Sequence, residues 1–190
     1  MNSINEAWKE AILRAVIVAG LVVAFGFVVF RPFIFIRTMV PYQFLVTGVT
    51  LGISYAAFKS RAPRIGFIAL FAWYALLTGR HASQNIWSFI LFGCYIIGIT
   101  AAVYVYILVA GKSFVNGRTQ RIIASTLIIG VANGLIALLL GSFSIQAVLA
   151  SPRVFLEASF YNVLIGAVMG IVCGVGIELA EYVLISLLKV

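Results

Sequence analysis

Residues 160–188 read FYNVLIGAVMGIVCGVGIELAEYVLISLL, an apolar run whose only charged side chains are Glu178 and Glu181. A helix needs about 20 mostly apolar residues to cross the hydrocarbon core of a bilayer, which is about 30 Å thick. This run is long enough, and a helix that is apolar on every side has no face to offer to water. The stretch therefore predicts a membrane-spanning helix and sets the class of the chain.

The rest of the 190-residue chain has the same character. Hydrophobic residues make up 64% of it and charged residues only 9%, and its mean hydropathy is +1.17. Soluble domains are typically about 45–50% apolar and about 25% charged. We predict an all-α polytopic membrane protein, a single transmembrane domain over residues 1–190. It is a bundle of six transmembrane helices, at about 11–30, 40–58, 65–79, 87–110, 121–141 and 160–188.

The positive charges decide whether the short third run, 65–79, is a span. Such a helix is about 22 Å long, shorter than the hydrocarbon core, but the flanking Arg64 and Arg80 can snorkel outward. With six spans and a cytoplasmic N-terminus, most Lys and Arg residues lie inside, and only Arg31, Arg37, Arg80 and Arg153 lie outside. Without this span the cations divide almost evenly, against the positive-inside rule. We therefore predict six spans, both termini cytoplasmic, in the cytoplasmic (inner) membrane of a bacterium or archaeon.

The net charge of +8 has the same explanation. The cations stand between apolar runs, where they orient a membrane protein and meet anionic headgroups. This placement favours the lipid bilayer as the partner, and no nucleic acid.

Small residues recur at intervals of four in four of the predicted spans. In lipid, such spacing lets helix backbones approach closely and so drives packing. One interpretation is packing within this chain. The other is that the alanine stripe faces a membrane-protein partner or a second copy in a homo-oligomer. The residues are Ala11, Ala15, Ala19, Gly48, Gly52, Gly130, Gly134, Gly166, Gly170 and Gly174.

Charged side chains inside a span suggest function by default. Glu178 and Glu181 are three residues apart on the last span, and the predicted topology puts them in the same leaflet as Arg14. We predict an intramembrane ion pair between Arg14 and these carboxylates. A coupling or proton-relay role, and simple exposure at the headgroups, are the alternatives.

Polar and aromatic residues gather on the predicted outer side. They form either an interfacial belt or an outward-facing pocket with apolar walls, suited to an aromatic or anionic small-molecule ligand. Asn133 lies within a span, where its amide must bridge helices or line that pocket. The candidate substrate-binding residues are Arg37, Tyr42, Arg80, His81, Asn85, Trp87, Asn133 and Asn162.

Catalytic chemistry finds little support. The chain has no aspartate and one histidine, so aspartyl catalysis and a usual zinc site are both excluded. Ser54 follows Gly52 as in a serine nucleophile motif, but His81 falls on the opposite side of the membrane. We predict no catalytic residues, no metal site and no cofactor, and hence no enzyme.

The length, the six spans, the cytoplasmic termini and the stripe of Ala11, Ala15 and Ala19 resemble the S components of energy-coupling-factor transporters. The resemblance covers the topology of the whole chain, but only the stripe in residues. It implies a subunit that binds a vitamin or similar micronutrient from outside. It also implies that the stripe docks onto a transmembrane coupling subunit driven by two ATPases.

The sequence thus predicts a membrane transport subunit that binds a small solute from the outer side and works with partner subunits. Two other interpretations stay open. The chain also suits the membrane anchor or sensor domain of a signalling protein of the cyclase or kinase type, or a structural subunit of a larger membrane complex.

Overall fold

The computed structural model describes residues 2–34, 40–79, 86–112, 115, 117–142 and 152–188. Every regular element within these residues is helical. The elements are α1 (Asn2–Ile34), α2 (Val40–Lys59), α3 (Pro63–Gly79), α4 (Ile86–Ala110), α5 (Arg118–Ser125), the π-helical turn η1 (Thr126–Gly130), α6 (Val131–Ser142) and α8 (Pro152–Leu188). Since α5, η1 and α6 follow one another without a break, the described chain forms six rods. The predicted all-α class is confirmed, and each predicted span lies within one rod.

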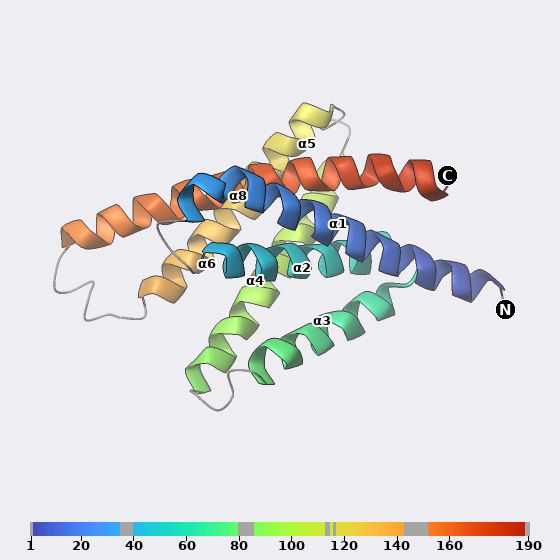
Figure 1. Cartoon of the computed structure of the whole chain (residues 1–190), viewed down its shortest axis with the longest axis horizontal. Helices are drawn as coiled ribbons and strands as arrows, with labels where there is room; N and C mark the ends of the chain where they lie inside the picture. Colours follow the sequence, from blue (N-terminus) through green and yellow to red (C-terminus); the bar gives the residue numbers. More distant parts are fainter. Residues whose placement is uncertain are drawn as a thin grey trace.

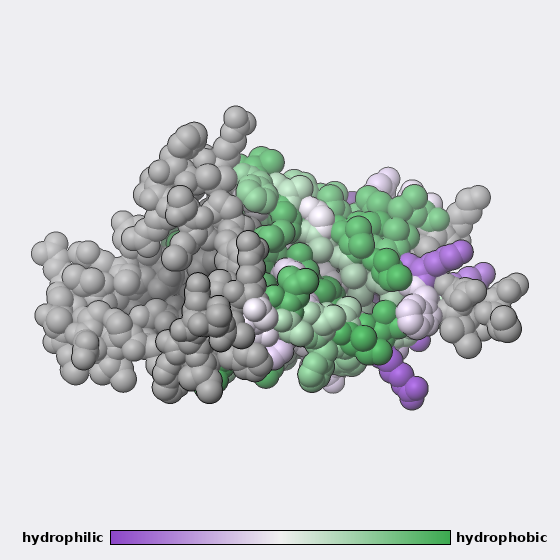
Figure 2. Space-filling view, turned by 60° about the horizontal axis from the view of Figure 1, so that its bottom comes forward, coloured by the Kyte–Doolittle hydropathy of each residue, from purple (hydrophilic) through white to green (hydrophobic). Residues whose placement is uncertain are grey.

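Four helical segments are long and apolar enough to cross a membrane: Glu6–Val29, Phe92–Ala110, Arg118–Ile136 and Val163–Leu187. Two shorter apolar helices, Leu45–Lys59 and Pro63–Gly79, accompany them. Large apolar side chains lie on the outside of the bundle, and Figure 2 shows them on one face as a broad band, next to hydrophilic residues at one end of that band. Water would penalise such a surface and lipid does not, so this is an integral membrane protein.

Two helices organise the bundle. α2 packs against α1, α3 and α4, whereas α8 packs against α1, α5, η1 and α6. Figure 1 shows α1 and α2 running side by side in opposite directions. It also shows the first turn of α1 and the last turn of α8 at the same end of the molecule. The described chain therefore begins and ends on one side of the apolar band.

The larger core lies where α1, α2, α4 and α8 meet. Its fully buried side chains include Val22 from α1, Leu51 from α2, Ile99 from α4 and Met169 from α8. A smaller cluster joins α2, α3 and α4. Because lipid is as apolar as these side chains, the fit between them contributes more to helix association than hydrophobicity does.

The last helix differs from the sequence-based expectation. A helix over 152–188 is about 55 Å long, so the sequence predicts a break near Ser159 to Asn162 and a short surface helix before it. That prediction is wrong: α8 is continuous from Pro152 to Leu188. Neither proline nor glycine occurs between Pro152 and Gly166, so a break would give up backbone hydrogen bonds with nothing to replace them.

Candidate functional site

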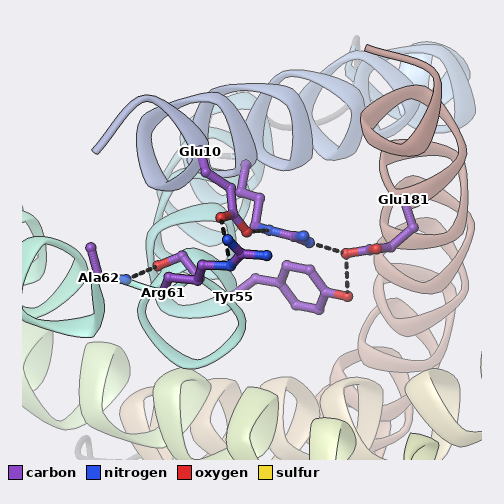
Figure 3. Close-up of polar contacts among 7 residues, drawn as sticks. Glu10, Tyr55, Arg61, Ala62 and Glu181 are labelled. Carbon is purple, nitrogen blue, oxygen red and sulfur yellow. Dashed lines mark hydrogen bonds and ion pairs between the residues drawn. The ribbon is translucent and has the colours of Figure 1, made fainter. Parts of the chain in front are cut away.

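A cluster of charged residues joins three helices at the end of the bundle where α1 begins. Arg14 of α1 donates from Nε to Glu10 Oε1 (3.1 Å) and from Nη1 to Glu181 Oε1 of α8 (2.5 Å). The Tyr55 hydroxyl of α2 donates to the same Glu181 oxygen at 2.9 Å (Figure 3). We call Glu10, Arg14, Tyr55 and Glu181 the charge cluster.

The charge cluster is shielded from solvent and nearly balanced. The side chains of Arg14, Glu10 and Glu181 are 14%, 17% and 24% exposed. One buried cation thus serves two carboxylates, and Arg61, at 4.0 Å from the second Glu10 oxygen, adds a further positive charge from the surface. Burying unpaired charges is costly, and this pairing offsets the cost. The cluster therefore acts as a polar clamp on α1, α2 and α8.

Glu178 is not part of this clamp. The sequence predicts that Arg14 pairs with both carboxylates of the last span, but Glu178 instead faces Arg121 of α5, at 3.7 Å. The reason is helical geometry. Residues three apart on an α-helix point about 60° apart, so Glu181 reaches α1 while Glu178 reaches α5. The Arg14–Glu181 pair was predicted correctly, and the Arg14–Glu178 pair was not.

A row of hydroxyl groups runs along the buried side of α2. Thr47, Thr50 and Ser54 are each fully buried. Thr50 accepts a hydrogen bond from Trp73 Nε1 of α3 at 3.1 Å, and Ser54 shares one with Thr100 of α4 at 2.9 Å. Hydrogen bonds of this kind hold helices together in lipid, where an unpaired polar group is costly.

The row on α2 extends across the bundle through Tyr95 of α4. The Tyr95 hydroxyl is hydrogen-bonded to Thr47 and donates to Asn133 Oδ1 of α6 at 3.3 Å. A tyrosine has one hydroxyl proton, so Thr47 is the donor to Tyr95 when Tyr95 donates to Asn133. We call Thr47, Tyr95 and Asn133 the polar triad. Through this triad Asn133, which is 8% exposed, bridges α6 to α4.

The turn before Asn133 departs from regular α-helix. Thr126–Gly130 form a π-helical turn between α5 and α6. On either side of its start, the Ser125 hydroxyl donates to the Gly170 carbonyl of α8 at 3.0 Å and the Thr126 hydroxyl donates to the Ile122 carbonyl at 2.8 Å. π-Turns inside helices are rare and often accompany functional sites. Here the turn lies between Ser125, which is hydrogen-bonded to α8, and Asn133 of the polar triad.

The alanine stripe of the first helix packs within the chain. A Cβ atom built on Gly52 of α2 would lie 2.5 Å from the Ala15 carbonyl oxygen and 2.8 Å from the Ala19 Cβ. A Cβ on Gly48 would lie 2.6 Å from a Val23 methyl carbon. Ala11 is likewise buried, at 2% exposed. In the structure α2 packs against Ala15 and Ala19, which are only partly exposed.

The other glycine motifs face each other across α8 and the η1–α6 segment. A Cβ on Gly166 would lie 2.6 Å from the Gly130 carbonyl oxygen and 2.8 Å from the Gly134 Cα. A Cβ on Gly170 would meet the Gly130 Cα at 2.8 Å, and one on Gly174 would meet the Ser125 Cβ at 2.9 Å. These glycines let the two backbones touch.

The remaining candidate substrate-binding residues cannot be placed. Arg37, Arg80, His81 and Asn85 lie outside the described residues. Three further candidates belong to described helices, but their side chains lie outside the described part: Tyr42, Trp87 and Asn162. The outer pocket therefore stays a prediction, with Asn133 as its one described member.

Within the described part of the chain, no three side chains of His, Cys, Asp or Glu lie close enough together to hold a metal ion. Protein-family models, curated proteins and solved structures were all compared with this chain, and none of them matches it.

Proposed function

We propose that this chain is a membrane transport subunit with six spans and cytoplasmic termini, which binds a small solute from the outer side. The two shorter apolar helices bring the number of proposed spans from four to six. Helix α3 is about 25 Å long, so the cations that flank it need to snorkel only a short way for it to cross. Exposed cations at the shared end of α1 and α8, among them Lys9, Arg61 and Arg64, support a cytoplasmic position for that end. The membrane we propose is that of a bacterium or archaeon.

The polar triad supports the solute site. Thr47 lies about 18 Å along α2 from Lys59, and Tyr95 about 22 Å along α4 from Ala110. Asn133 lies about 22 Å along its rod from Arg118. In a core about 30 Å thick, these positions fall beyond the midplane, towards the outer side. We propose that the triad forms the floor of the outer pocket and presents amide and hydroxyl groups to a solute.

The observation that carries this proposal is the combination of the triad with the π-turn. Substrate sites of secondary transporters are commonly built near the midplane from helices that depart from regular geometry. Here η1 ends three residues before Asn133 in a rod that is otherwise α-helical. The charge cluster supports the direction of entry, because it clamps α1, α2 and α8 together at the opposite end.

The docking face of a partner subunit is a separate matter. The resemblance to energy-coupling-factor S components implies docking through Ala11, Ala15 and Ala19, but Ala11 is buried and α2 packs against Ala15 and Ala19. We therefore propose a partner subunit without assigning it to this stripe.

A thermal-shift screen tests the solute site. Purified protein in detergent is heated with vitamins, nucleosides, amino acids and aromatic acids, and a ligand that binds only the folded state raises its Tm. We expect at least one compound to do so. Tyr95→Phe and Asn133→Ala are then expected to weaken its binding about tenfold, since each removes a hydrogen bond in a buried site.

Tyr104→Phe is the matched control, because Tyr104 lies on the same helix but points outward and is 47% exposed. It is expected to leave binding unchanged. The proposal fails if no compound raises the Tm. It also fails if the Tyr95 and Asn133 variants bind the compound as tightly as the Tyr104 variant.

A further inference from the structure

A second group of charged residues lies at the end of the bundle where α5 begins and α8 ends. Arg121 Nη1 is 3.7 Å from Glu178 Oε1, and Arg118 lies over the ring of Tyr182 with its guanidinium carbon 5.8 Å from the ring centre. Lys112, in the connection before α5, is exposed. Two cations thus lie beside one carboxylate, with Lys112 on the preceding connection, whereas Arg14 and Arg61 in the charge cluster are balanced by two carboxylates.

Arg121 is only partly satisfied by the protein. Its Nε is buried and is the side-chain polar atom that lacks a hydrogen-bond partner among the described residues. Its contact with Glu178 is longer than a charge-assisted hydrogen bond, which is usually about 2.7–2.9 Å. The Arg121 side chain as a whole is 40% exposed, so a ligand can reach it from outside. Its remaining donors suit the planar, two-point recognition of a phosphate group.

The local fold holds these cations at the headgroup level. The apolar segment Arg118–Ile136 begins at Arg118 itself, and the segment Val163–Leu187 ends five residues after Tyr182. Tyrosine is enriched at this level of the bilayer, and Tyr182, at 63% exposed, faces outward. Val115, at 5% exposed, anchors the α4–α5 connection in the core. The cations are thus held where lipid phosphates lie.

We propose that the start of α5 and the adjoining turn of α8 bind the phosphate of an anionic phospholipid. Arg118 and Arg121 contact the phosphate, Lys112 adds positive charge, and Tyr182 holds the Arg118 guanidinium and packs against the glycerol region. The site is separate from the polar triad and does not depend on the proposed transport role. Basic sites between helices on the cytoplasmic side are a recognised mode of lipid binding.

Lipid binding by the full chain tests this proposal. Purified protein is titrated in mixed micelles with phosphatidylglycerol or with phosphatidylcholine, and bound lipid is counted by native mass spectrometry. We expect preferential retention of phosphatidylglycerol. Each cation near a lipid surface changes the affinity about fivefold, so Arg118→Gln with Arg121→Gln is expected to weaken that binding about 25-fold.

Lys59→Gln with Arg64→Gln is the matched control. It removes two exposed cations from the same end of the bundle, at the α2–α3 connection, and is expected to change binding less than twofold. If the Arg118 and Arg121 double variant does not fold, Arg118→Gln alone is expected to lose about fivefold. Arg121→Lys then tests the forked geometry, with weaker binding expected although the charge is kept.

Three results overturn the proposal. They are equal retention of both lipids, equal losses of bound phosphatidylglycerol in the double variant and its control, or binding of inorganic phosphate as tight as that of phosphatidylglycerol. The first two rule out the proposed site, and the third rules out a lipid as its ligand. The solute-induced Tm shift is expected to persist in Arg118→Gln, so failure of the lipid site and failure of the solute site are distinguishable.

Discussion

Gly170→Leu is expected to disrupt the bundle, lowering its stability by at least about 3 kcal/mol. A Cβ atom at this position would lie 2.7 Å from the Thr126 Cα and 2.8 Å from the Gly130 Cα. Both obstacles are backbone atoms, so no side-chain rotation can relieve the clash, and α8 must move away from η1. The measurement is thermal unfolding in detergent, where we expect the Tm to fall by about 6–12 °C or the protein to aggregate during purification.

Gly20→Leu makes the same chemical change at a position with nothing within 4 Å of the added Cβ atom. Gly20 is exposed on α1, so the new side chain faces lipid. We expect a Tm within about 2 °C of the unchanged protein, because exposed substitutions usually alter stability by less than about 0.5 kcal/mol. Equal losses in the two variants would show that α8 and η1 do not touch as described.

Arg14→Ala and Glu181→Ala are each expected to cost about 3 kcal/mol, because each leaves a shielded charge without its partner. Once one partner is gone, removing the other restores part of the loss. The double variant is therefore expected to cost about 1–3 kcal/mol less than the sum of the single variants. The measurement is a double-mutant cycle of unfolding free energies in mixed micelles.

Two controls make the cycle specific. Arg61→Ala is expected to change stability by less than about 0.5 kcal/mol, since Arg61 is 82% exposed and 4.0 Å from Glu10. Arg14→Ala combined with Glu178→Ala is expected to be additive, because Glu178 pairs with Arg121. Strict additivity of Arg14→Ala with Glu181→Ala would reject the charge cluster as a clamp.

The sequence predicts the helices well because the bilayer sets their length and composition. The run 65–79 is a good example, since α3 extends it by only two residues, from Pro63 to Gly79. The Arg14–Glu181 pair also follows from topology, because two opposite charges in one leaflet gain by meeting. Glu10 was missed although it stands four residues before Arg14, the spacing of an ion pair on one helix.

The polar triad was harder to foresee. The Asn133 amide needs a hydrogen-bond partner, but the helix that supplies it depends on how each helix is rotated about its own axis. Hydropathy does not determine that rotation. Thr47, Thr50 and Ser54 have a helical spacing and carried a signal for a polar stripe on α2. The partners Tyr95, Trp73 and Thr100 look like ordinary interior residues in sequence. Their roles emerge only once the helices are packed.

The π-turn of the fifth rod leaves no local mark in the sequence, yet it lets the rod hold one residue more than a regular α-helix of the same length. Ser125 meets α8 before the turn and Asn133 meets α4 after it. A π-helical turn holds about one residue more than an α-helical turn. Deleting one residue between Thr126 and Gly130 would therefore let the rod close into regular α-helix with Asn133 still facing Tyr95. A deletion just beyond the turn, at Val131 or Ala132, would instead rotate Asn133 by about 100° away from Tyr95.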